Sequence, residues 1–571
     1  MIGKRKAQAR LFDVGNVYPL ALKAGSFHSQ LAEAAPRVFA DDDFAAIYSD
    51  RLGRPSVPPS LLALALLLQN EAGVSDEEAI ERTAFDLRWA AVLGRAAGEP
   101  LCAKSTLQLF RAHLILHEGI RTVFRASILE AKRAGLLRGK ALRIAVDTKP
   151  MEGRGAVQDT YNLLAAGIRQ LAAALAKIAG QKLSPWLQSH GLARYAEASL
   201  KGSVDIDWSD ASARDRLLGE VVADAERLLN HTVGAGAQAA KAAELLQALL
   251  LQDVTRNVPS EGSNAAEVRV KEGTAKGRIP SATDPEQRHG HKSHSTLFTG
   301  HKASIDDRAA RLYAADVDSQ IIVAVEALPG DSGDAANVLD MVSQAEENTG
   351  EEVAQTIADC AYGAGAIRQA FADSGRELIA KVPREMNRAT GLLPKSAFQI
   401  DLENNTVTCP GGHTTGVYQQ KKDGSRLFYF GAACGGCPLR SQCTTRAKGR
   451  TVQVHPQEAL LRIARTYQQT PEGRTRLRQR VVVEHRLARL AQLGIRQARY
   501  IGRAKTGFQL MIAATIANLR RTWNWQASRA ENRGPDPLVV GHPGQNPILI
   551  WLQCVLTSAT TMSNRQVNVV V

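Results

Sequence analysis

Two short apolar segments that end in aspartate constrain the fold of this chain more than any other feature. ALRIAVD at 141–147 alternates apolar side chains and ends in Asp147, and EVAQTIAD at 352–359 ends in Asp359. Alternation of this length is typical of β-strands. The ends of such strands gather at one edge of a sheet. The two segments therefore predict a sheet with carboxylates at its edge.

Further strands are expected nearby in the sequence. The segments HKASIDD, RLYAADVD and IIVAVEAL within 300–328 are separated by short polar breaks, and Asp318-Ser319 is the expected turn of one hairpin. A helix at about 334–348 precedes the Asp359 strand, and RELIAKV follows it. Antiparallel strands followed by a helix and parallel-type strands predict an α/β core.

Long helical segments flank this core. Residues 27–130 read as several helices, starting after Pro58-Pro59 and at Ser75, which has Glu78 three residues on. Residues 160–256 are rich in alanine and leucine at helical spacing, whereas polar residues 258–295 are expected to be loop. The N-terminal helices suit either DNA contact or packing and dimerisation. The basic residues that favour DNA contact are Arg88, Arg95, Lys104 and Arg111.

The positive charge of the chain is concentrated in one segment. The chain has 571 residues and a net charge of +14. Between Arg440 and Trp525 stand 18 Lys and Arg residues against three Glu, so the remainder is near neutral. Such a segment attracts phosphate backbones. A solvated basic helix face, or attachment to an anionic membrane surface, would also explain such a segment. Arginine greatly exceeds lysine in it, however, and it lacks a clean amphipathic membrane pattern.

No run of about 18 apolar residues is present, and no apolar segment follows the basic N-terminus, so a cytoplasmic, nucleoid-associated protein is expected.

Four of the seven cysteines lie close together. Cys409, Cys434, Cys437 and Cys443 contain a C-x-x-C core that suits one Zn²⁺ ion in a small β-rich module. The first spacing is long and irregular, so reduced, solvent-facing thiols are an equal alternative. His413 is a weaker substitute ligand.

Three acids suit metal-dependent phosphoryl chemistry. Asp147 and Asp359 end strands, and Glu484 stands in the basic helix RQRVVVEHRLARL. Carboxylates bind hard cations such as Mg²⁺, and a pair of ions can activate a nucleophile and stabilise a leaving oxygen. Spacings of 212 and 125 residues leave the alternative that these aspartates are only turn formers or caps.

A family resemblance favours the catalytic interpretation. The segments that carry it are AVDTKPMEGRGAVQDTYNLL at 145–164, IADCAYGAGAIRQA at 357–370, RQRVVVEHRLARLAQLGIRQARYIGRAKTGFQLMIAATIANLRRTW at 478–523, and TDPEQRHGHKSH…FTGHKASID at 283–306. They resemble bacterial insertion-sequence DDE transposases, with the IS elements of the 1182 type, in the IS4/IS5-like DDE superfamily, as the most similar group. The helices at 27–120 resemble the N-terminal domain of these enzymes.

The resemblance implies an RNase H-like catalytic core in which Asp147, Asp359 and Glu484 hold Mg²⁺ or Mn²⁺. It also implies binding of double-stranded DNA (terminal inverted repeats and target) by a homodimer or higher assembly, without a membrane. One departure is Ala491, where related enzymes have lysine, and Arg489 or Arg496 could replace it. The predicted DNA contacts come from Arg480, Arg486, Arg489, Arg499, Tyr500 and Lys505.

Five parts follow from these arguments. They are an N-terminal extension (1–26), a helical domain (27–135), a catalytic domain (136–395 and 457–525) with a helical insertion (160–256), a cysteine-rich β module (396–456) and a tail (526–571). Three alternatives to a transposase remain. They are a metal-dependent DNA nuclease, a catalytically inactive DNA-binding remnant, and a zinc hydrolase, which thiolate-only ligation disfavours.

Overall fold

The computed structural model describes residues 1–5, 14–18, 21–49, 53–138, 141–232, 236–257, 267–273, 275, 277–293, 296–301, 311–333, 335, 337–383 and 391–532. The chain divides into two units, Met1–Arg521 and Thr522–Val571. Most of the predicted tail, and the expected strand HKASIDD beyond His301, lie outside the described residues.

The N-terminal part of the described chain is helical, as predicted. Helix α3 begins at Pro59, whose fixed φ suits a first helical position, and its residues 59–70 are all buried. Ser75 caps α4 by accepting from the backbone N–H of Glu78 at 3.1 Å, but the Glu78 carboxylate pairs with Arg82 instead. Helix α6 begins at Lys104. The helices are α1 (Val14–Val17), α2 (Phe27–Val38), η2 (Asp41–Ile47), α3 (Pro59–Ala72), α4 (Asp76–Phe85), α5 (Leu87–Leu93), α6 (Lys104–Leu116) and α7 (Ile120–Arg133).

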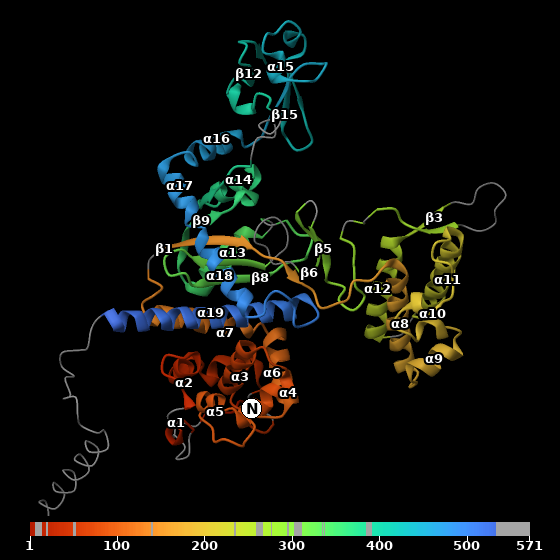
Figure 1. The fold of residues 1–571 in the computed structure, drawn as a ribbon, viewed down its shortest axis with the longest axis vertical. Helices are drawn as coiled ribbons and strands as arrows, with labels where there is room; N and C mark the ends of the chain where they lie inside the picture. Colours follow the sequence, from red (N-terminus) through yellow and green to blue (C-terminus); the bar gives the residue numbers. More distant parts are fainter. Residues whose placement is uncertain are drawn as a thin grey trace, which may run out of the picture. The chain divides into compact units, whose positions relative to one another are not determined.

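A five-stranded mixed sheet forms the centre of the next part (Figure 1). Its order is β10-β9-β1-β7-β8; β1 pairs antiparallel with β7 and β7 with β8, whereas β1, β9 and β10 run parallel. The expected turn at Asp318-Ser319 joins β7 to β8, where Asp316 accepts from the Ser319 backbone at 2.8 Å. The strands are β1 (Ala141–Thr148), β7 (Arg311–Asp316), β8 (Ile322–Ala327), β9 (Glu352–Ala358) and β10 (Glu377–Ala380).

Helices cover this sheet and bury its apolar side chains. Helix α13 (Val338–Thr349) contacts β7, β8 and β9, and α18 (Val481–Gln492) contacts β1 and β7. In α19 (Arg503–Asn532), the Asn518 side chain accepts from the Ile322 N–H at 2.8 Å and donates to the Ile322 carbonyl at 2.9 Å. Asn518 therefore pairs the backbone of edge strand β8. Two further elements near the sheet are η4 (Cys360–Gly363) and α14 (Gly365–Asp373).

The expected helical insertion is a bundle with its own apolar core (Figure 1). Among the described residues, no single helix is long and apolar enough to cross a membrane. Helices α8 and α9 reach that length and hydropathy only when taken as a pair, and the pair is bent by 100°. The elements are α8 (Thr160–Ile178), α9 (Leu183–Ser189), η3 (Ala193–Tyr195), α10 (Leu200–Ser203), α11 (Ala211–Asn230) and α12 (Gly236–Asp253).

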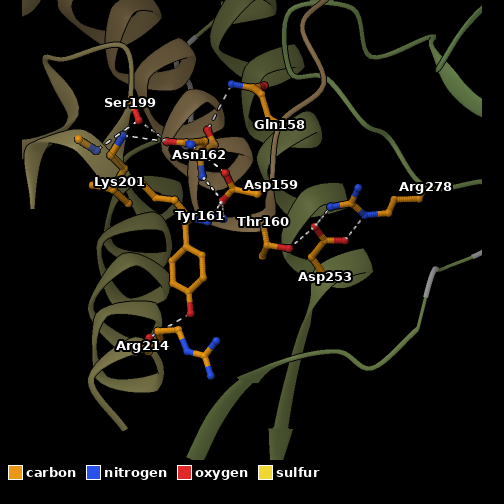
Figure 2. A network of polar contacts seen from close by, with 12 residues as sticks. Gln158, Asp159, Thr160, Tyr161, Asn162, Ser199, Lys201, Arg214, Asp253 and Arg278 are labelled. Carbon is orange, nitrogen blue, oxygen red and sulfur yellow. Dashed lines mark hydrogen bonds and ion pairs between the residues drawn. The ribbon is translucent and has the colours of Figure 1, made fainter. Parts of the chain in front are cut away.

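Polar contacts join the two ends of this insertion. Figure 2 shows Asp253, at the end of α12, between Thr160, which begins α8, and Arg278. The Arg278 guanidinium donates to both carboxylate oxygens at 2.9 and 2.6 Å, and the Thr160 hydroxyl donates at 2.9 Å. Asp159 caps α8 by accepting from the backbone N–H groups of Tyr161 and Asn162. The chain therefore enters and leaves the insertion at one place.

The expectation that 258–295 is loop was wrong in part. Strand β4 (Glu267–Val270) pairs with β3 (Val254–Asn257), and β5 (Arg288–Ser293) pairs with β6 (Thr296–His301), which also pairs with β2 (Met151–Glu152). Strand β5 is polar, and β4 is only four residues long, so neither has an apolar pattern long enough to predict a strand. Backbone pairing with partners elsewhere in the chain, rather than local pattern, forms them.

The cysteine-rich module has two small three-stranded sheets and a core of only seven buried residues. Buried Glu458 accepts from Lys395 of this module and, at 2.8 Å, from Arg465 of α16. The module's elements are η6 (Lys395–Ala397), β11 (Gln399–Asp401), β12 (Thr406–Thr408), β13 (Thr414–Thr415), β14 (Tyr418–Gln420), β15 (Arg426–Tyr429), η7 (Gly431–Cys434), α15 (Arg440–Cys443) and β16 (Thr451–Val454). Helices α16 (Glu458–Tyr467) and α17 (Pro471–Arg478) follow.

Candidate active site and DNA interface

The sheet brings Asp147 and Asp359 to neighbouring positions. Strands β1 and β9 run parallel with Ala145 opposite Ile357. Asp147 lies two residues beyond Ala145 in β1, and Asp359, directly after the end of β9, lies two residues beyond Ile357. The register therefore brings the two aspartates close together, at a strand spacing of about 4.8 Å. Asp147 is fully buried and Asp359 is 9% exposed. Two acids that are 212 residues apart in sequence therefore meet at one sheet edge.

Backbone donors hold both aspartates in place. Asp147 accepts from the N–H of Thr148 at 2.8 Å. Asp359 caps the short helix η4 by accepting from the N–H of Ala361 at 2.9 Å. These bonds fix one oxygen of each carboxylate.

Glu484 reaches the same region from α18. Val483, Leu487 and Leu490 are buried in the core that includes the central sheet. This packing fixes the helix against the sheet, and the Glu484 side chain remains 41% exposed.

The Arg480 side chain links the first acid to the third. Its Nη1 donates to Oδ2 of Asp147 at 2.6 Å, and its Nη2 donates to Oε1 of Glu484, one helical turn on. The guanidinium is 24% exposed, whereas the Asp147 side chain is 1% exposed. A single arginine thus neutralises part of the charge of a site that contains three carboxylates.

The donor set fits divalent metal ions with a preference for oxygen ligands. All three acids present carboxylate oxygens, two of the acids are buried, and the Arg480 guanidinium binds both Asp147 and Glu484. In the described part of the chain, no three His, Cys, Asp or Glu side chains already stand in a geometry that closes on a metal ion.

The segments that follow Asp147 and Glu484 in the chain contact each other. The backbone of Glu152 bonds to Arg496 and Ala498 at 3.0 and 2.8 Å. A Cβ on Gly153 would lie 2.2 Å from the Gln287 amide, and one on Gly155 would lie 2.5 Å from the Ser281 hydroxyl, so these glycines permit close approach.

Two acids that bind the segment after Glu484 were not identified in the sequence analysis. Asp284 accepts from the N–H of Gly502 at 3.3 Å, and Glu286 accepts from the N–H of Arg503 at 2.6 Å. Both partners lie in segments that carry the family resemblance, TDPEQ at 283–287 and the segment 478–523 that contains Gly502, so their pairing could have been considered.

The basic residues predicted to contact DNA fall into two groups. Arg486 and Arg489 belong to α18, and Arg521 belongs to α19. Burial lowers the pKa of Arg486, and the positive charges of Arg521 and Arg489 lower it further. The Arg486 Nε is buried without a hydrogen-bond partner. Arg489 donates to Gln492 at 2.5 Å, and Lys505 is exposed.

Arg499 and Tyr500 lie against the N-terminal helices instead. Arg499 donates to the Val74 carbonyl, and the ring of Tyr500 lies 5.3 Å from the Arg111 guanidinium and 5.9 Å from that of Arg499. Burial raises the pKa of Tyr500, whose hydroxyl has no hydrogen-bond partner. Their placement joins the C-terminal motif to the helical domain.

The four basic residues singled out in the N-terminal helices all form ion pairs within that domain. The pairs are Arg88–Asp86 (2.6 Å), Arg95–Glu99 (3.3 Å), Lys104–Glu77 and Arg111–Asp76 (2.6 Å). Arg111 is only 9% exposed. These pairs favour the packing interpretation for Arg111, since its charge is used inside the domain.

The four predicted cysteine ligands are brought together. Cys409, Cys434, Cys437 and Cys443 line one small cavity, and His413 also lines it. None of the described cysteines forms a disulfide.

Comparisons with known proteins identify two segments. Residues 408–523 match a family model described as a transposase DDE domain, and residues 20–113 match one described as a transposase domain (DUF772). The first match contains Glu484, whereas Asp147 and Asp359 lie outside both. No curated protein and no solved structure matches the chain. These two segments of the chain are therefore similar to transposase domains.

Proposed function

We propose that this chain is a DDE transposase that binds the terminal inverted repeats of an insertion sequence, cuts DNA strands beside them and joins the freed 3′ ends to target DNA. The observation that carries the proposal is the meeting of Asp147, Asp359 and the Arg480–Glu484 pair at one edge of the sheet. The matches to two transposase models, one on each side of the first two acids, support it.

Asp147, Asp359 and Glu484 are the residues that would hold Mg²⁺ or Mn²⁺. When bound, such ions activate water or a DNA 3′-hydroxyl and stabilise the leaving oxygen of a phosphodiester. Burial of both aspartates keeps water away from the carboxylates, and their backbone hydrogen bonds keep them oriented. The five-stranded mixed sheet supports an RNase H-like core for this domain.

Arg480 has two roles in this proposal. In the unliganded protein its guanidinium offsets the charge of Asp147 and Glu484. If the acids held metal, the Arg480 guanidinium would be available to a DNA phosphate oxygen, which it suits.

DNA binding is assigned to the basic segment between Arg440 and Trp525. Exposed Lys505 and the Arg486–Arg489 pair offer positive charge outside the ion pairs of the N-terminal domain. Because two DNA ends must be joined in one event, we place the active form in a dimer or higher assembly. Assignment to the 1182 type rests on the sequence resemblance.

The test is a cleavage and strand-transfer assay with labelled DNA that carries the parent element's ends, in Mg²⁺ and in Mn²⁺. The unmodified chain is compared with Asp359→Ala and with the control Asp373→Ala, which alters an aspartate at the end of α14. We expect cleavage and transfer by the unmodified and control chains, and DNA binding without either reaction by Asp359→Ala.

Other outcomes identify the alternatives. Cleavage without transfer indicates a metal-dependent nuclease, and binding without cleavage by the unmodified chain indicates a catalytically inactive remnant. Cleavage that survives Asp359→Ala contradicts the three-carboxylate mechanism.

A further inference from the structure

We propose that Cys409, Cys434, Cys437 and Cys443 form a structural zinc site that stabilises the cysteine-rich module. The four thiols come from three separate places in the module: the end of β12, the η7 turn and the end of α15. Nevertheless all four line one cavity. This convergence goes beyond the spacing, which alone leaves reduced thiols as an equal alternative.

The size of the cavity suits a single ion. Its volume is about 20 Å³, which is the room that one water-sized sphere needs. A methyl group on Gly411 would stand 3.4 Å from the sulfur of Cys437 and 3.6 Å from that of Cys409, so both sulfurs face this glycine. Among the described residues, these thiols are not yet close enough together to hold a metal ion. Zinc binding is therefore expected to draw them inward by a small movement.

One backbone donor and two guanidinium groups lie beside the cavity. The Arg450 backbone N–H donates to the Cys434 sulfur at 3.4 Å, a contact that stabilises a negatively charged sulfur. The guanidinium of Arg450 donates to the Cys443 carbonyl at 3.0 Å, and that of Arg440 donates to the Cys434 carbonyl at 3.0 Å. Two positive charges thus lie beside a site whose four thiolates would exceed the charge of Zn²⁺ by two.

The apolar core of the module is small, so a metal cross-link would add to its stability. Its strands are two to four residues long, and seven side chains make up the buried core, one of them Cys443 itself. Modules of about 60 residues rarely bury enough apolar surface to fold without a disulfide or a metal. The described cysteines form no disulfide, so their thiols are free to act as metal ligands.

Four protein ligands leave no open position, so the ion would be structural rather than catalytic. The inference does not depend on the proposed DNA chemistry, because the cysteines and the three acids are separate groups. A variant such as Asp359→Ala should lose cleavage and keep its zinc.

The test uses the full-length chain. Metal content of the purified protein is measured by mass spectrometry, with about one zinc per chain expected. Cys437→Ser is expected to lose it, whereas the matched control Cys102→Ser, which alters a half-buried thiol of the N-terminal domain, is expected to retain it. Replacement of zinc by Co²⁺ in the unmodified chain should give the sulfur-to-cobalt charge-transfer band of tetrahedral thiolate ligation. This spectrum decides the matter even if the serine variant does not fold.

Three results overturn the proposal. One is a folded protein that contains no metal, gives no cobalt band, and has all four thiols accessible to a thiol-reactive reagent. Another is disulfides among these cysteines in non-reducing peptide maps. The third is loss of zinc in His413→Ala, which would replace the four-thiolate set with one that contains histidine.

Discussion

Arg480 donates a 2.6 Å hydrogen bond to Asp147, a carboxylate 333 residues earlier in the chain. The contact joins helix α18 to the end of strand β1 and adds to the bond from Arg480 to Glu484. It holds two of the three proposed catalytic acids around a positive charge that belongs to the protein. A metal ion and this guanidinium compete for the same oxygens.

Replacing Arg480 by glutamine is therefore expected to increase the affinity of the DNA-free protein for Mn²⁺ by about 10- to 100-fold, since a hydrogen bond to a charged group contributes about 1.5–3 kcal/mol. Calorimetric titration measures the affinity, and Arg474→Gln on α17, away from the acids, is the control. Strand cleavage by Arg480→Gln should fall despite the tighter metal binding. Unchanged affinity for Mn²⁺ would show that the guanidinium does not compete with the metal.

The Asp76–Arg111 pair predicts a pH-dependent stability. Burial alone would raise the pKa of Asp76, but hydrogen bonds from Arg111, Gln69 and Gln108 outweigh it and lower the pKa well below its usual range. The stabilisation is therefore present above the unfolded-state pKa of about 3.9 and is lost as the pH falls below it. Asp76→Asn should reduce the free energy of unfolding by about 3 kcal/mol at pH 7, because it leaves Arg111 buried and unpaired.

Denaturant unfolding between pH 7 and pH 3 measures this effect. The difference between unmodified protein and Asp76→Asn should shrink toward acid pH, whereas Asp42→Asn, an exposed carboxylate, should change stability little. A difference that stays constant with pH would argue that packing, rather than charge, accounts for the loss.

The Arg486–Arg489 pair is expected to bind phosphate. Loss of either side chain should weaken binding of duplex DNA about tenfold at low salt and reduce the dependence of log K on log salt by about one counterion. Fluorescence anisotropy over a salt series measures both quantities. Arg88→Ala is the control, because Arg88 is already paired with Asp86. An equal loss in the control, or an unchanged salt slope, would contradict the assignment.

Local pattern predicted the strands that carry the acids. ALRIAVD and EVAQTIAD have enough apolar alternation to form β1 and β9, and their ends are the ends of the strands to within one residue. The parallel register that places Asp147 beside Asp359 depends on pairing across the fold, which alternation alone does not specify. Polar β5 was missed for the same reason, since only its partner β6 makes it a strand.

Side-chain partners were the least predictable part of the site. Arg480 was expected to contact DNA, and no local signal indicates that its partner is Asp147. Arg499 and Tyr500 were likewise assigned from their motif, whereas the structure places them against Val74 and Arg111. Contacts between residues hundreds of positions apart arise from the packing of whole elements, so a sequence read segment by segment does not contain them.

The closed ends of the insertion affect the order in which the chain can fold. Strand β1 ends at Thr148 and its partner β7 begins at Arg311, so pairing them closes a very long loop. The contacts within α8–α12 are nearer in sequence than those of the sheet, and helical bundles with local contacts form quickly. Once Asp253 has bound Thr160 and Arg278, about a hundred residues no longer contribute to the entropy of closing that loop. The insertion can thus shorten the search by which the first strand of the sheet finds the second.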